Sequence, residues 1–164
     1  LAYWDQVIAE VSQDYPDVEL HNMYIDNASA SFVLRPQIFD VILTTNMFGD
    51  ILSDLGGAVM GSLGFGPSGN INPEKTFPSM FEPIHGSAPD IAGQGIANPI
   101  GTIWSAALML DHLGESTAAK NMVMAIEATT MSGLRSVDIG GAAGTKEITE
   151  AICKALQTSA TVAN

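Results

Sequence analysis

Apolar side chains recur along the chain at two spacings, and each spacing predicts a different kind of element. Intervals of three and four residues, together with capping residues, predict helices over residues 1–13, 26–35, 46–60, 98–113, 116–132 and 145–157. Alternating or β-branched apolar runs predict strands over residues 18–25, 40–45 and 80–84. The order helix, strand, helix, strand, helix in the first third predicts an α/β sheet with crossover connections.

The middle of the chain differs from the rest in its composition. Six glycines and almost no charge lie between Gly56 and Asn72, which indicates a loop and strand region that crosses from one domain to another. A second loop, rich in Gly, Ala and Pro, is predicted over residues 85–99.

Composition narrows the class of protein. The chain has 164 residues, 46% of them hydrophobic, which suits a globular domain rather than a disordered one. Only 6 Lys and Arg face 18 Asp and Glu, so the net charge of −12 argues against nucleic acid and anionic membranes as partners. No apolar run reaches about 18 residues, so no membrane span is expected. The lone Cys153 suits a reducing compartment, so we expect a cytoplasmic protein with Cys153 buried.

Two acids on the helix predicted over residues 46–60 are candidates for metal binding. At about 100° per residue, Asp50 and Asp54 lie side by side at the edge of an apolar face. That face is expected to be buried and consists of Met47, Phe48, Ile51, Leu52, Leu55 and Val59. Carboxylate oxygens are the ligands that Mg²⁺ and Mn²⁺ prefer. The alternative is a pair of solvated acids on a helix flank, because such pairs are common.

Asp26 is the candidate for a third metal ligand. It follows a predicted strand, and the carboxyl ends of strands border the ligand crevices of open α/β sheets. The alternative is an N-cap for the helix that follows.

The loop that begins at Glu82 is a candidate nucleotide site. Small residues let a backbone approach a bulky ligand, and free N–H groups near a helix start suit phosphate oxygens. Asp90 could accept hydrogen bonds from ribose hydroxyls, and His85 is the one histidine in a loop of this kind. The alternative is a connecting loop in which Asn98 caps the next helix.

Four motifs in order resemble those of the β-hydroxyacid oxidative decarboxylases, the family of isopropylmalate, isocitrate and tartrate/D-malate dehydrogenases. The motifs are YIDNA at 24–28, NMFGDILSD at 46–54, EPIHGSAPDIAG at 82–93 and ANP at 97–99. The resemblance covers essentially the whole chain. Within the family, GPSGNINPEK at 66–75 and FPSMFE at 77–82 are most similar to tartrate/D-malate dehydrogenases.

The resemblance implies an isopropylmalate dehydrogenase-like α/β fold, in which two lobes share a mixed sheet flanked by helices. Residues 1–60 would belong to the dimer-forming, metal-binding lobe, and residues 61–164 to the C-terminal part of the NAD-binding lobe. Asp50 and Asp54 would bind Mg²⁺ or Mn²⁺ in one subunit of a homodimer. Asp26 would act across the interface, as a ligand and catalytic group in the partner's site.

The same resemblance implies a set of NAD-binding residues. They are Glu82, His85, Gly86, Ser87, Ala88, Asp90 and Asn98, with Asp90 at the adenosine ribose and Asn98 near the adenine. Family members that use NADP carry a Lys-Tyr pair where this chain has Asp90 and Ile91. A carboxylate there would repel a 2′-phosphate, which favours NAD.

The implied activity is oxidative decarboxylation of a 2-hydroxy diacid, either tartrate or D-malate. The alternative substrate is 3-isopropylmalate, the intermediate of leucine biosynthesis, and the alternative class is a non-catalytic regulatory or dimerisation subunit. The family's arginine cluster and its proton-transferring Tyr and Lys precede the segment that corresponds to Leu1, so the N-terminal elements of the fold are missing. We therefore expect a C-terminal portion of the enzyme that is inactive on its own.

Overall fold

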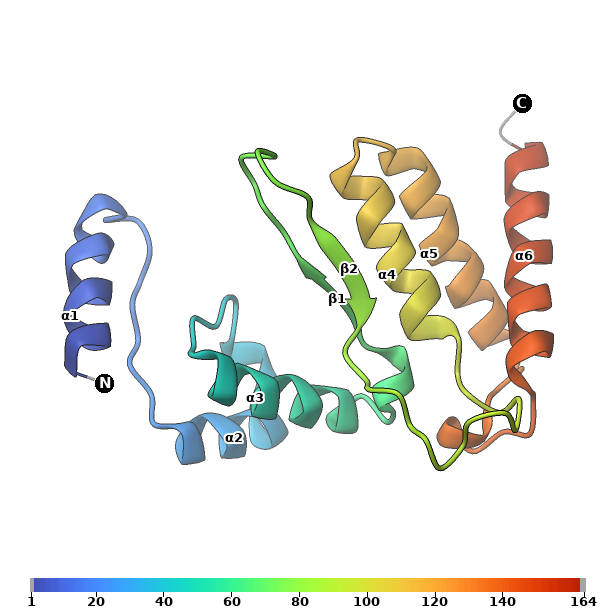
Figure 1. The fold of residues 1–164 in the computed structure, drawn as a ribbon, viewed down its shortest axis with the longest axis horizontal. Helices are drawn as coiled ribbons and strands as arrows, with labels where there is room; N and C mark the ends of the chain where they lie inside the picture. Colours follow the sequence, from blue (N-terminus) through green and yellow to red (C-terminus); the bar gives the residue numbers. More distant parts are fainter. Residues whose placement is uncertain (1, 163–164) are drawn as a thin grey trace. The chain divides into compact units, whose positions relative to one another are not determined.

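The computed structural model describes residues 2–162, with side chains described to residue 158. The chain divides into two compact units at Asp40 and Val41. Most of the described residues are helical, and the helices lie close to the predicted ranges (Figure 1). None of the described helices is both long enough and apolar enough to cross a membrane.

The first unit contains α1 (Ala2–Val11) and α2 (Ile25–Leu34), with short 3₁₀ turns at Ser12–Asp14 and Pro36–Ile38. Helix α1 buries none of its residues, so its apolar stripe lies open. Helix α2 buries Ala28 and Ser31, and the ring centroid of Phe32, near the end of this helix, lies 4.9 Å from that of Phe39.

The second unit begins with α3 (Asn46–Val59), a 3₁₀ turn at Leu63–Phe65 and the strands β1 (Pro67–Asn70) and β2 (Met80–Pro83). The helices α4 (Ile100–His112), α5 (Ser116–Met131) and α6 (Thr145–Val162) follow, with the 3₁₀ turn η4 (Val137–Ile139) before α6. Strands β1 and β2 form an antiparallel pair in which Ser68 lies opposite Glu82.

The core of the second unit lies where the last three helices meet. Helix α5 packs between α4 and α6, and α4 also packs against the β1–β2 pair (Figure 1). The buried cluster consists of Ile100, Ala125, Ile126, Ala143, Ile148 and Ile152. Helix α4 ends before Gly114, whose φ of +93° is a conformation that only glycine adopts readily.

The predicted strands over residues 18–25 and 40–45 are not formed. Residues 19–24 and 41–45 have no regular structure, and the only sheet of the described chain is the β1–β2 pair. The expected mixed sheet is therefore absent from the described residues. A parallel strand needs a hydrogen-bonded neighbour, and neither run has one here, so Val41 is 90% and Leu43 64% exposed.

Two predictions of burial were also wrong. Helix α3 buries Leu52 and half-buries Phe48 and Leu55, but Met47 and Ile51 of the expected face are more than half exposed. Cys153 is exposed on α6 rather than buried. Both predictions expected burial of side chains that the other described residues leave exposed.

Candidate functional site

The two candidate metal ligands of the second unit lie one turn apart on α3. Asp50 and Asp54 are both exposed, and within the described chain neither carboxylate has a hydrogen bond or an ion pair. Four unengaged oxygen atoms on one helix flank suit a hard divalent cation. The carboxylates of Asp50 and Asp54 therefore suit two of the ligand positions of Mg²⁺ or Mn²⁺.

Asp26 lies in the first unit, in the first turn of α2. The helix begins at Ile25, so Asp26 is inside the helix and the alternative of an N-cap is wrong. Its Oδ1 accepts a hydrogen bond from the Asn27 amide at 2.8 Å, and an acid in a first helical turn is favoured by the helix dipole. The described residues contain no group of three or more acidic, His or Cys side chains close enough to hold a metal. Joint metal binding by Asp26, Asp50 and Asp54 stays a prediction.

The candidate nucleotide loop runs from β2 to α4. Glu82, Ser87 and Asp90 are exposed, and within the described chain the carboxylates of Glu82 and Asp90 have no partner. His85 is half-buried, and its Nδ1 lies 3.0 Å from the carbonyl oxygen of Gly86. The loop therefore presents two unpaired carboxylates and a hydroxyl to solvent.

The backbone of this loop is strained at one place. Ala88 has a φ of +40°, in the left-handed region that side chains other than glycine rarely adopt. Such a conformation costs on the order of 1–3 kcal/mol and clusters at ligand-binding sites. The turn that follows is closed by the Ile91 amide, which donates to the Ala88 carbonyl at 3.1 Å, and by Gln94 Nε2, which donates to the Asp90 carbonyl at 2.8 Å.

The far end of the loop is fastened by residues much later in the chain. Thr145, the first residue of α6, donates its amide to the Gly95 carbonyl at 2.8 Å and its hydroxyl to the Ala97 carbonyl at 2.5 Å. Asn98 is nearly buried, and its Oδ1 accepts from the Ile100 amide at 3.0 Å. Asn98 thus satisfies the first amide of α4, although the N-cap residue of this helix is Pro99 rather than Asn98 as the capping alternative expected.

Asp138 of η4 is a residue of this region that the sequence patterns did not single out. Burial disfavours its charged form, but interactions with the hydroxyls of Ser136 and Ser62 and with the amide of Asn98 outweigh this and hold the pKa of Asp138 below its ordinary 3.8. The Ser136 hydroxyl is buried, and its geometry falls short of a regular hydrogen bond. Ionisation of Asp138 therefore stabilises the folded chain at neutral pH, and this contribution is lost as the pH falls through the lowered pKa.

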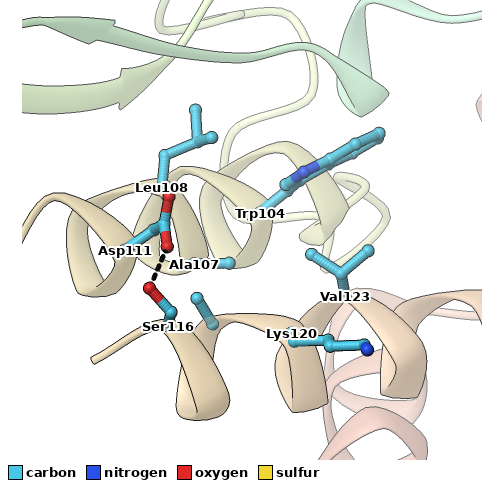
Figure 2. Close-up of a pocket in the computed structure, with 8 residues that line it drawn as sticks. Trp104, Ala107, Leu108, Asp111, Ser116, Lys120 and Val123 are labelled. Carbon is cyan, nitrogen blue, oxygen red and sulfur yellow. Dashed lines mark hydrogen bonds between the residues drawn. The ribbon is translucent and has the colours of Figure 1, made fainter. Parts of the chain in front are cut away.

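A shallow cleft of about 240 Å³ lies elsewhere, between α4 and α5 (Figure 2). Trp104 and Leu108 of α4 and Val123 of α5 give it apolar walls, and the Ser116 hydroxyl donates to Asp111 at 2.6 Å on its rim. None of the predicted site residues lines this cleft. It is therefore separate from the candidate metal and nucleotide positions.

Comparison with known proteins agrees with the motifs. The sequence profile of the isocitrate/isopropylmalate dehydrogenase family matches residues 1–152. A probable tartrate dehydrogenase/decarboxylase of Agrobacterium vitis is 51% identical over 156 residues, which are 95% of this chain and 44% of the relative. The decarboxylating D-malate dehydrogenase of Escherichia coli is 47% identical over 159 residues, which are 94% of this chain and 44% of the relative.

Solved structures give the same picture. The isocitrate dehydrogenase of Methylococcus capsulatus superposes with a TM-score of 0.86 at 40% identity, over 92% of this chain and 44% of that one. A β-decarboxylating dehydrogenase of Thermococcus kodakarensis gives 0.81 at 38% identity, over 98% and 46%. This chain thus spans less than half the length of these relatives. Together, the motifs, the profile and the superpositions show that the chain belongs to the isocitrate/isopropylmalate dehydrogenase family.

Proposed function

We propose that this chain is the C-terminal, metal- and nucleotide-binding portion of an NAD-dependent decarboxylating dehydrogenase that acts on tartrate or D-malate. The observation that carries the proposal is the pair of unpartnered carboxylates on α3, in a chain about 50% identical to tartrate and D-malate decarboxylating dehydrogenases. The alternative substrate, 3-isopropylmalate, is supported by the name of the family profile.

Asp50 and Asp54 would hold Mg²⁺ or Mn²⁺, since both present free carboxylate oxygens on one face. When bound, such a cation supplies Lewis-acid stabilisation of the negative charge that develops on the substrate's oxygens. The helix fixes the backbone positions of the two residues one turn apart, so only their side chains have to become ordered on binding. Asp26 would complete the site of a partner subunit in a homodimer.

The loop from Glu82 to Asn98 would bind NAD. Small residues at Gly86, Ser87 and Ala88 leave room for close approach of the dinucleotide, and Asp90 is free to accept hydrogen bonds from ribose hydroxyls. The same carboxylate would repel the 2′-phosphate of NADP.

Loss of one acid on α3 is expected to weaken Mn²⁺ binding. Asp50→Asn and Asp54→Asn should each reduce the affinity by about tenfold or more, because a coordinating charge is removed. Calorimetric titration of the dimeric protein measures the change. The matched control is Glu127→Gln, which removes the same charge from an exposed position on α5. Unchanged binding in the Asp50 variant would favour a non-catalytic subunit instead.

The contribution of Asp26 across a dimer interface can be tested by mixing variants. Asp26→Asn protein and Asp50→Asn protein each lack one ligand in every site. In their equimolar mixture, about a quarter of all sites regain the full set, because half of the dimers are mixed and each holds one intact site. Recovery of Mn²⁺ binding in the mixture supports the shared site, and its absence argues against it.

The polypeptide alone is expected to be inactive. A dicarboxylate substrate needs cationic groups, and this chain has only two arginines, Arg35 and Arg135, neither of which matches the family's cluster. We expect no reduction of NAD with D-malate by the 164-residue chain. The whole protein that contains it should turn over D-malate or tartrate faster than 3-isopropylmalate. Faster turnover of 3-isopropylmalate would reverse the substrate assignment.

A further inference from the structure

One carboxylate ties together three segments that are far apart in the sequence. Oδ2 of Asp138 accepts a hydrogen bond from the Ser62 hydroxyl and another from Asn98 Nδ2, the latter at 3.0 Å. The donors lie 76 and 40 residues away along the chain. Ser62 Oγ in turn accepts from the Gly64 amide at 2.9 Å. The carboxylate thus joins the segment after α3, the end of the nucleotide loop and η4.

These contacts give the Asn98 amide a single orientation. Its Nδ2 faces the Asp138 carboxylate, and its Oδ1 faces the Ile100 amide at 3.0 Å. A flipped amide would place oxygen against a carboxylate and NH₂ against an N–H donor. After these bonds, the Asn98 side chain keeps one N–H and one oxygen lone pair for a ligand.

Close packing around the amide reinforces this orientation. Asn98 is only 8% exposed. A Cβ added at Gly64 would lie 2.8 Å from Asn98 Cβ and 2.9 Å from Asp138 Oδ2, so the three residues lie against one another. The acceptor is ionised at neutral pH, since the pKa of Asp138 lies below its ordinary 3.8. Asn98 therefore has little freedom to adopt another rotamer while Asp138 is in place.

Building on the nucleotide site proposed above, we propose that Asp138 is a positioning residue for its adenosine end, which holds the Asn98 amide ready for the ligand. Its effect is exerted through Asn98, without contact between Asp138 and the nucleotide. The ligand class is an adenosine-containing nucleotide, and the nicotinamide half is not affected.

The test compares 5′-AMP with nicotinamide mononucleotide as ligands of the dimeric protein. Asp138→Ala should weaken 5′-AMP binding by roughly three- to tenfold, the effect of one lost hydrogen bond, and leave nicotinamide mononucleotide unchanged. Asp138→Asn keeps an oxygen acceptor in place and should retain more of the 5′-AMP affinity. Side-chain amide signals of Asn98 in ¹⁵N NMR should shift in Asp138→Ala, which reports the orientation without any assay of activity.

Ser62→Ala is the matched control. It removes the other donor to the same carboxylate but does not touch Asn98, so 5′-AMP affinity should change less than about twofold even if stability falls. If Asp138→Ala does not fold, Asp138→Glu can replace it, because it displaces the carboxylate by one methylene. Binding of 5′-AMP and of nicotinamide mononucleotide is then compared in the same way.

The outcomes separate the two proposals. If the unaltered protein binds neither 5′-AMP nor NAD, the nucleotide site itself is wrong and the inference falls with it. If it binds both, and Asp138→Ala leaves 5′-AMP affinity unchanged, only the positioning role is overturned. Equal weakening of 5′-AMP and nicotinamide mononucleotide binding by Asp138→Ala, or equal weakening of 5′-AMP binding by Ser62→Ala, would show a general structural effect and would also overturn it.

Discussion

Gly141→Ala is expected to be the most destabilising single methyl addition in the second unit. A Cβ at Gly141 would overlap the carbonyl group of Arg135 and lie 2.5 Å from the Arg135 Cβ. The obstacle is backbone, and this backbone is held by the Ala143 amide, which donates to the same Arg135 carbonyl at 2.9 Å. This overlap can be relieved only if the turn between α5 and α6 opens. We therefore expect the free energy of unfolding to fall by about 3 kcal/mol or more.

Two other glycines separate steric from conformational effects. A Cβ at Gly140 meets nothing within 4 Å, but its φ of +78° is strained for alanine, so Gly140→Ala should cost about 1–2 kcal/mol. A Cβ at Gly86 also meets nothing, and no positive φ opposes it, so Gly86→Ala should be close to neutral. Chemical denaturation measures all three. A Gly141 variant as stable as the Gly86 variant would contradict the packing described for this turn.

Ile148→Ala is expected to have the second large effect. Ile148 is 1% exposed and belongs to the cluster formed by α4, α5 and α6. Its truncation leaves a cavity that the neighbouring helices fill only in part, which costs about 2–5 kcal/mol. The midpoint of urea unfolding should fall accordingly, with an unchanged slope.

The control for Ile148 is a helical isoleucine outside the core. Ile51 on α3 is 52% exposed, and alanine has the better helix propensity, so Ile51→Ala should change stability by less than about 0.5 kcal/mol. A similar loss in both variants would mean that the exposed face of α3 is covered in solution.

The helices could be predicted from the sequence because their apolar spacing is a local property. The helix that begins at Asn46 and the one that begins at Ser116 start at or next to the predicted residues. The strands predicted over residues 18–25 and 40–45 are not formed, because a strand exists only when another strand pairs with it, whereas the strand predicted over residues 80–84 is β2, which pairs with β1. Val41 and Leu43 have the β-branched and apolar pattern of a buried strand, yet nothing in the described chain pairs with them.

The candidate site was predictable only in part for a related reason. The acids on α3 and the loop at Glu82 follow from spacing and motif. Asp138 does not, because its partners Ser62 and Asn98 lie 76 and 40 residues away and no local pattern connects them. Gly141 is a local sign that the turn after Asp138 is tightly packed, since a Cβ there would overlap the Arg135 carbonyl group.

The hydrogen bonds from Thr145 to the candidate nucleotide loop have a consequence for biosynthesis. The carbonyls of Gly95 and Ala97 obtain their donors from a residue about 50 positions later, so the loop cannot reach its final form when it leaves the ribosome. It becomes ordered only after the start of α6 has been translated. Truncation of the gene between the codons of Met131 and Thr145 would therefore yield a chain whose α4 and α5 can pair but whose candidate nucleotide loop lacks these hydrogen bonds.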